Sequence, residues 1–157
     1  MPRFLVVEDD HLQEGPLQDA LAVAFADAQV RTASTEEEFR TALPELRAAP
    51  PDLIVLDVML RWADPRPDPT PPPADVVAGG YYRAGLRCAR LLAADERLAG
   101  VPVILYTILE LDDLERDGQR LPPNATYVGK TADLDALVRH IRTRLRPVGP
   151  RRPARSR

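Results

Sequence analysis

Five side chains in the 157-residue sequence are of types that could do chemistry together, and each follows a short apolar run. Three are carboxylates, one is a hydroxyl and one is the single lysine of the chain; they are Glu8, Asp9, Asp57, Thr107 and Lys130. Three carboxylates in one cleft repel each other unless a cation lies between them. Oxygen ligands without histidine or thiol suit Mg²⁺, which also accepts a phosphate oxygen. Because a carboxylate can attack phosphorus and form an acyl phosphate, this set is compatible with phosphoryl transfer.

The elements that must position these residues are expected to form a parallel sheet. A continuous apolar run, such as 53–56 directly before Asp57, is typical of a strand buried on both faces. Strands are predicted at 4–7, 28–33, 53–56, 101–106 and 125–128. Segments with helical spacing of apolar residues separate them. This order predicts an α/β fold, a doubly wound five-stranded parallel sheet with the flavodoxin-like strand order 2-1-3-4-5.

That strand order would bring the five side chains to one place. The carboxyl ends of the first, third, fourth and fifth strands lie at the same edge of such a sheet, around its switch point. The sequence therefore predicts one site with three carboxylates, a hydroxyl and an ammonium group. For Asp57 alone, the simpler interpretation is a carboxylate that ends a strand at the surface.

A helix is expected after each strand, at 16–25, 35–46, 82–92, 109–117 and 134–145. Pro16 fits the first turn of the first helix, and Thr35 with Glu38 forms a capping box for the second. Pro44 is expected to kink the second helix or to end it early. Thr131 is the candidate N-cap of the last helix.

Two further segments differ in composition from the rest of a domain that spans 1–146. Residues 61–80 contain six prolines and are expected to be an inserted loop, extended and partly polyproline II. Residues 147–157 form a basic tail that is expected to be disordered. Residues 146–157 hold five arginines and no acid, whereas the remainder holds 16 basic and 24 acidic residues, a net charge of −8. This acidic body argues against nucleic acid as the main partner.

The composition also bears on the compartment. The chain contains one cysteine, so an internal disulfide is excluded. It shows no signal peptide and no apolar run of membrane-spanning length. A cytoplasmic protein without a membrane partner is expected.

Four stretches of the chain resemble the receiver domain of two-component response regulators. They read FLVVEDD, DLIVLD, VPVILYT and YVGK, at residues 4–10, 52–57, 101–107 and 127–130. The resemblance covers residues 3–146. Three features depart from the family pattern. They are the enlarged loop at 61–80, Thr131, which stands where the family usually has a proline after a cis peptide bond, and Ile108, which follows Thr107 where a small residue is common and would narrow access to Asp57.

The resemblance implies a role for each residue of the site. Asp57 would be the phosphoacceptor, and Lys130 would pair with the phosphoryl group. Mg²⁺ would be bound by Glu8, Asp9, Asp57 and the backbone carbonyl of Met59. Thr107 would bind a phosphoryl oxygen and move on activation, and Tyr127 would be the aromatic switch residue coupled to it.

The function that follows is a single-domain response regulator in a phosphorelay. It would accept a phosphoryl group from a histidine kinase or a phosphotransfer protein and signal by binding a downstream protein. It would not be an enzyme beyond its Mg²⁺-dependent self-phosphorylation and self-dephosphorylation. One alternative is a phosphorylation-independent adaptor that docks through the Pro-rich loop, and another is a nucleic-acid binder that uses the arginine tail. A Mg²⁺-dependent phosphatase is disfavoured, because Val58 and Met59, and no second acid, follow Asp57.

Overall fold

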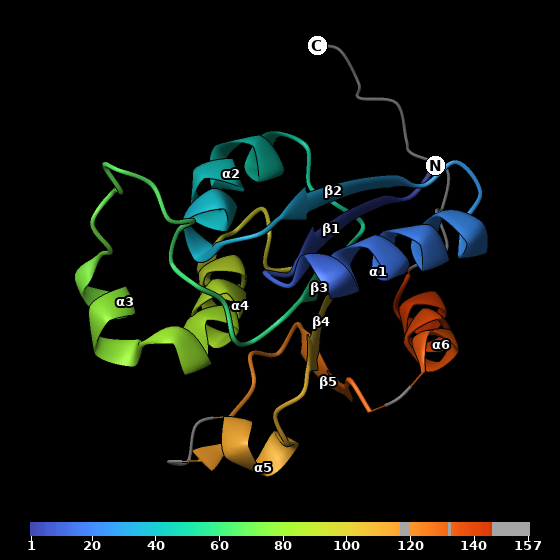
Figure 1. Cartoon of the computed structure of the whole chain (residues 1–157). Helices are drawn as coiled ribbons and strands as arrows, with labels where there is room; N and C mark the ends of the chain where they lie inside the picture. Colours follow the sequence, from blue (N-terminus) through green and yellow to red (C-terminus); the bar gives the residue numbers. More distant parts are fainter. Residues whose placement is uncertain (117–119, 132, 146–157) are drawn as a thin grey trace.

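A parallel sheet of five strands, in the order β2-β1-β3-β4-β5, forms the centre of the computed structural model (Figure 1). The structure describes residues 1–116, 120–131 and 133–145. The strands are β1 Arg3–Val7, β2 Gln29–Ala33, β3 Leu53–Leu56, β4 Val103–Thr107 and β5 Ala125–Gly129. All strand pairs are parallel, and the predicted fold class is confirmed.

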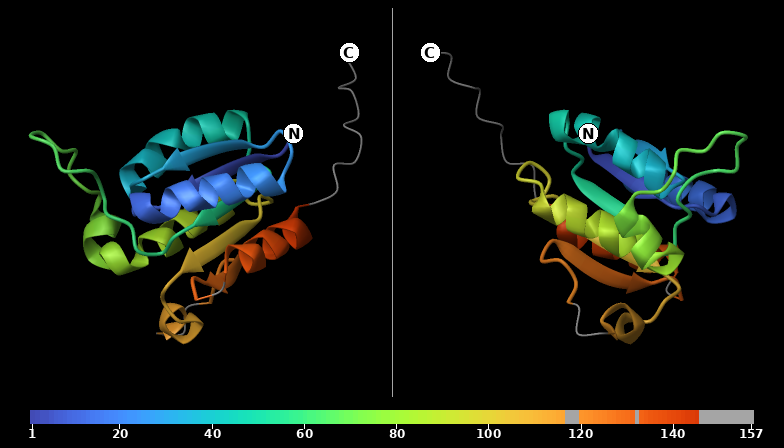
Figure 2. Two further views of the ribbon diagram at one scale, coloured as in Figure 1. Left: turned by 45° about the vertical axis from the view of Figure 1, so that its right-hand side comes forward. Right: turned by 90° about the vertical axis from the view of Figure 1, so that its left-hand side faces the viewer.

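Helices cover both faces of this sheet (Figure 2). They are α1 His11–Ala24, α2 Glu36–Ala48, α3 Ala74–Gly79, α4 Ala84–Ala94, α5 Leu111–Leu114 and α6 Leu134–Arg144, with a 3₁₀ turn, η1, at Tyr81–Arg83. Buried side chains of α1 and α6 pack on one face, and those of α2 and α4 pack on the other. Every residue of β3 is buried, as its uninterrupted apolar sequence predicts. No helix in the described part of the chain is long and apolar enough to span a membrane.

Three expectations about helix ends are corrected. Helix α1 begins five residues before Pro16, because the Asp10 carboxylate accepts a hydrogen bond from Leu12 N at 2.9 Å and caps the helix there. Helix α2 runs through Pro44 to Ala48, so the proline does not end it early. The carboxylate of Asp133 caps α6 by accepting from Ala136 N at 2.7 Å, and Thr131 does not.

The capping interaction predicted for α2 is present with one change. Thr35 Oγ1 accepts a hydrogen bond from Glu38 N at 3.1 Å. The Glu38 carboxylate accepts in return from Ser34 N at 2.6 Å, one residue before the expected partner. Two backbone donors at the start of α2 are therefore satisfied.

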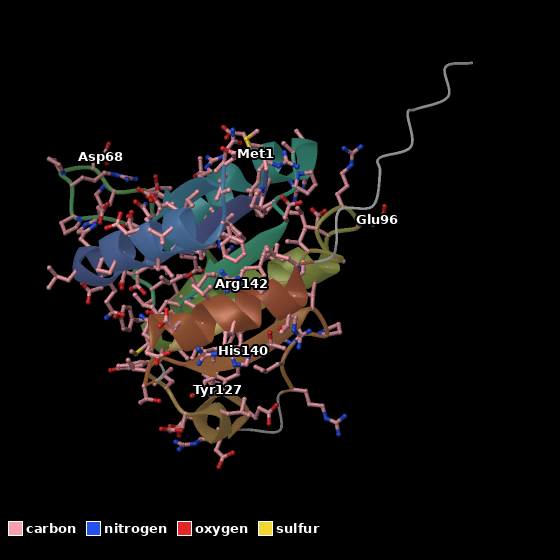
Figure 3. All side chains as sticks on the ribbon, turned by 90° about the vertical axis from the view of Figure 1, so that its right-hand side faces the viewer. Met1, Asp68, Glu96, Tyr127, His140 and Arg142 are labelled. Carbon is pink, nitrogen blue, oxygen red and sulfur yellow. The ribbon has the colours of Figure 1, made fainter. Side chains whose placement is uncertain are left out.

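The Pro-rich segment 61–80 leaves the end of β3, projects past α2 and returns through α3 (Figure 2). Figure 3 labels Asp68 on the projecting part. Residues 64–75 are exposed and residues 63–73 contain no helix or strand, as expected, but residues 74–79 form a helix that the proline content did not predict. The basic tail 147–157 lies outside the described residues.

Polar contacts hold this segment against α2 and α4. Within the segment, Trp62 Nε1 donates to Thr70 O at 2.8 Å. Toward α2, the Arg66 guanidinium donates to both carboxylate oxygens of Glu37 at 2.9 and 2.7 Å. On the α4 side, Arg87 Nη1 donates to the carbonyl oxygen of Gly80, the last residue of the segment, at 2.8 Å. The same guanidinium donates two hydrogen bonds to the fully buried Glu36 of α2, at 3.0 and 2.7 Å. The segment is therefore built onto the domain by paired charges and hydrogen bonds.

Candidate functional site

Lys130 connects the carboxylates of two strand ends at the carboxyl edge of the sheet. Its Nζ donates to Glu8 Oε2 at 2.6 Å and to Asp57 Oδ2 at 2.8 Å. The register explains the meeting, because Val7 is paired with Leu56 and each is followed directly by an acid. All three side chains are almost fully buried, with exposed fractions of 6%, 3% and 7% for Lys130, Glu8 and Asp57.

Asp9 completes an acidic cluster. One carboxylate oxygen from each of Glu8, Asp9 and Asp57 lies within 4.8 Å of the others. Three hard oxygen donors at this spacing suit a divalent cation such as Mg²⁺, and buried carboxylates need such a charge to offset their repulsion. Met59 lies two residues beyond Asp57 and its side chain is half-buried. The role of its carbonyl as a ligand stays a prediction.

The surroundings shift the proton affinities of these groups. Burial, and next the Asp57 carboxylate, raise the pKa of Glu8 to about 7, although Lys130 acts in the opposite direction. Burial also raises the pKa of Asp9, against the influence of Arg61. For Lys130, burial lowers the pKa, but the hydrogen bonds and charges of Asp57 and Glu8 outweigh it, and the net pKa is raised. With all groups ionised, the three carboxylates outnumber the two neighbouring cations, Lys130 and Arg61.

We expect the metal-free protein to lose stability as the pH rises from 5 to 8. The pKa of Glu8 is about 7 in the folded protein and 4.5 as its ordinary value. Between these values the folded state keeps a proton that the unfolded state releases, so its contribution is fully present below pH 4.5 and is lost as the pH rises through 7. The loss is at most about 3 kcal/mol. Urea unfolding in EDTA at several pH values measures it.

Glu8→Gln is the control for this pH dependence. The amide cannot titrate, so the variant should show a flatter stability profile between pH 5 and 8. An equal loss of stability in the native protein and the variant would show that another group controls the profile.

The two predicted switch residues meet at the backbone of Leu109. Thr107 is fully buried, and its Oγ1 accepts a hydrogen bond from Leu109 N at 3.3 Å. Tyr127 Oη donates to Leu109 O at 2.8 Å. The carbonyl of Thr107 also accepts from Lys130 N at 2.8 Å, which ties the lysine backbone to the end of β4. The two side chains are thus linked, while their movement on activation stays a prediction.

The structure therefore brings together four of the predicted residues directly, Glu8, Asp9, Asp57 and Lys130. Thr107 is linked to them through the hydrogen bond between its carbonyl and Lys130 N. Tyr127 is linked to Thr107 only indirectly, through the backbone of Leu109. The described residues contain no cis peptide bond, so the peptide after Lys130 is trans.

Two residues contribute to the site although their side-chain types did not single them out. Gly85 N donates to Val58 O at 2.8 Å, and a Cβ atom at Gly85 would lie 2.0 Å from the carbonyl oxygen of Asp57. Helix α4 therefore packs directly against the backbone of Asp57.

The second residue is Arg61. Its backbone N donates to Asp9 Oδ2 at 3.2 Å, and its guanidinium donates to Asp9 O at 2.9 Å. No sequence pattern indicates the Arg61 contact, because it depends on how the segment after β3 folds back.

Comparison with known proteins agrees with this architecture. No protein-family model matches the chain, and no curated protein sequence matches it. Among solved structures, the receiver domain of a signal transduction histidine kinase from Syntrophus aciditrophicus is 22% identical, with a TM-score of 0.68 and coverage of 99% of this chain and 98% of that chain. The phosphorylated cyanobacterial phytochrome response regulator RcpA is 23% identical, with a TM-score of 0.63 and coverage of 90% and 89%.

A third similar structure is the Mn²⁺-bound form of response regulator Rcp1. It is 19% identical, with a TM-score of 0.61 and coverage of 91% of each chain. The chain thus has the fold of response-regulator receiver domains, as the sequence motifs suggested.

Proposed function

We propose that this protein is a receiver in a two-component system, and that it accepts a phosphoryl group on Asp57 with Mg²⁺ as cofactor. The observation that carries the proposal is the position of Lys130, whose Nζ lies 2.6 Å from Glu8 and 2.8 Å from Asp57 beside the carboxylate of Asp9. The similar structures support it, since RcpA is described as phosphorylated and Rcp1 as Mn²⁺-bound.

In the proposed reaction, a carboxylate oxygen of Asp57 attacks the phosphorus of a phosphohistidine. The new O–P bond forms as the N–P bond breaks, and the imidazole keeps the electron pair and takes up a proton. Mg²⁺, when bound by Glu8, Asp9, Asp57 and the Met59 carbonyl, supplies positive charge for the phosphoryl oxygens. Val58 N donates to Asp57 Oδ1 at 2.6 Å and orients the carboxylate.

Two further groups would bind the product. Lys130, now shared by Glu8 and Asp57, would pair with a phosphoryl oxygen. The Thr107 hydroxyl would donate to another and give up its bond from Leu109 N. Tyr127 Oη donates a hydrogen bond to the carbonyl of the same residue, Leu109. A movement of Leu109 would therefore also move Tyr127 and change the surface formed by β5 and its neighbouring helices.

The proposal includes the partners and the compartment. A histidine kinase or a phosphotransfer protein would supply the phosphoryl group, and a downstream protein would bind the phosphorylated form. The protein would act in the cytoplasm. Its only catalysis would be its own phosphorylation and dephosphorylation.

We expect incubation with acetyl phosphate and Mg²⁺ to add one phosphoryl mass to the native protein, measured by intact-mass spectrometry. Hydroxylamine should remove it, because it cleaves acyl phosphates. Asp57→Ala should gain no mass, and Asp68→Ala, on the exposed projecting segment, should behave as the native protein does. Equal labelling of Asp57→Ala would exclude Asp57 as the acceptor.

One observation favours a second candidate, the phosphorylation-independent adaptor. Residues 64–75 are exposed, yet contacts such as that of Arg66 with Glu37 hold the segment in place. A fixed, proline-rich surface would suit a partner with an aromatic-lined groove. In this case Asp57→Asn would leave binding of the downstream protein unchanged, whereas the first proposal expects the phosphorylated native protein to bind more tightly.

A further inference from the structure

Arg61 is the first residue of the Pro-rich segment and the only one there that contacts the acidic cluster in the described hydrogen bonds and ion pairs. It touches Asp9 in three ways. Its backbone N–H donates to Asp9 Oδ2 at 3.2 Å, its Nη2 donates to Asp9 O at 2.9 Å, and its Nε lies 3.7 Å from Asp9 Oδ2. The backbone and the side chain of Arg61 can therefore act differently on one carboxylate.

The backbone at this position is fixed. Arg61 O accepts from Glu36 N at 3.0 Å, and Trp62 O accepts from Glu37 N at 2.8 Å, so both carbonyls are held by the first turn of α2. Two backbone donors at a helix start have no partner within the helix, which makes this attachment favourable. The N–H that Arg61 offers to Asp9 is thus held in place by the fold, whatever side chain the residue carries.

The guanidinium of Arg61, in contrast, is not enclosed by the fold and has room to turn away from Asp9. Its side chain is 40% exposed, compared with 6% for Lys130. It also lies between two carboxylates, since Nη1 is 3.7 Å from Asp64 Oδ1 while Nε is 3.7 Å from Asp9. Rotation toward Asp64 would keep the arginine paired and take its charge away from Asp9.

The charges of the site explain why such a movement would matter. With all groups ionised, the carboxylates of Glu8, Asp9 and Asp57 contribute −3, and Lys130 and Arg61 contribute +2. A divalent cation among them adds two charges and repels both neighbouring cations. Lys130 is buried against two carboxylates, so of the two cations only the exposed guanidinium has room to move.

We propose that Arg61 is a positioning residue of the metal site, an inference that rests on the proposed Mg²⁺-dependent function. Its backbone N–H orients the Asp9 carboxylate. Its guanidinium acts as an internal cation that opposes Mg²⁺ binding and moves to Asp64 when the metal binds. Metal binding is thereby coupled to the first residues of the Pro-rich segment.

The test is the Mg²⁺ affinity of purified full-length variants, measured by isothermal titration calorimetry at low ionic strength. Arg61→Ala keeps the backbone N–H and removes the opposing charge, so it should bind Mg²⁺ roughly tenfold more tightly than the native protein. Arg61→Lys keeps the charge and should stay within about threefold of the native affinity. Arg66→Ala is the matched control, because it removes an arginine of the same segment that contacts Glu37 and not Asp9.

A second comparison tests the movement toward Asp64. Asp64→Asn removes the alternative partner and should weaken Mg²⁺ binding about threefold. The same change in the Arg61→Ala background should have a smaller effect, since no guanidinium then needs the partner. An equal loss of Mg²⁺ affinity on Asp64→Asn in both backgrounds would contradict the proposed movement of Arg61 toward Asp64.

The outcomes separate this inference from the proposed function. Native Mg²⁺ binding with equal or weaker affinity in Arg61→Ala would overturn the inference and leave the metal site intact. Absence of Mg²⁺ binding in both the native protein and Arg61→Ala would overturn the metal site and, with it, the inference. Tighter binding in Arg61→Ala and Arg66→Ala alike would show a general charge effect and would also overturn it.

Discussion

Replacement of Lys130 by methionine should abolish phosphorylation of Asp57 and destabilise the metal-free protein at pH 8 by about 3–5 kcal/mol. Lys130 is the one cation within hydrogen-bonding distance of both Glu8 and Asp57 among the described contacts. Methionine fills similar space without a charge. Two buried carboxylates would then face each other, and the cost is that of breaking a buried ion pair by removing one partner.

The pH dependence of the variant gives this prediction a second test. The pKa of Glu8 is already raised to about 7, and loss of Lys130 should raise it further. A folded-state pKa above the unfolded value adds stability at low pH that is lost as the pH rises. The difference between Lys130→Met and native protein should therefore shrink from pH 8 to pH 5.5 in urea unfolding experiments.

Two control variants separate charge from shape. Lys130→Arg retains the positive charge and should recover part of the stability, although a planar guanidinium does not reproduce the geometry of an ammonium. Glu8→Gln combined with Lys130→Met removes one of the facing charges and should be more stable than Lys130→Met alone at pH 8. Equal stability of Lys130→Met and native protein across this range would contradict the bridging role of the lysine.

The chemistry of the site could be predicted from sequence because it depends on strand ends. A buried parallel strand has a continuous apolar sequence, so the strand at 53–56 and the other strands can be recognised from their apolar runs alone. The strand order then brings the residues that follow them to one edge. This reasoning is enough to predict that Glu8, Asp57 and Lys130 lie close together. The distances from Lys130 Nζ, 2.6 Å to Glu8 and 2.8 Å to Asp57, agree with that prediction.

Other features depend on packing that the local sequence does not record. Helix α2 continues through Pro44 because Phe39, Ala42 and Leu46 are buried in the core, and tertiary packing outweighs the lost backbone hydrogen bond. The contact of Arg61 with Asp9 requires the backbone carbonyls of the segment to meet the start of α2. Each of these interactions joins parts of the chain whose proximity follows only from the whole fold.

Substitution of Gly85 by alanine should destabilise the protein by at least about 3 kcal/mol, the second large effect that we expect. An added Cβ would lie 2.0 Å from Asp57 O, 2.6 Å from Val58 Cα and 2.8 Å from Asp57 C. All three are backbone atoms at the end of a buried strand, so no side-chain rotation can relieve the overlap. Helix α4 or the end of β3 must move.

Gly15→Ala is the matched control for the Gly85 variant. Gly15 lies in helix α1, and a Cβ there would meet no atom within 4 Å. Alanine at this position should stabilise the protein by about 0.5–1 kcal/mol through helix propensity. Because a movement of β3 would also displace the Asp57 carboxylate from Lys130, Gly85→Ala should lower the rate of phosphorylation by acetyl phosphate under conditions in which the variant remains folded. A Gly85→Ala protein with native stability and a native rate would show that α4 does not hold the acceptor in place.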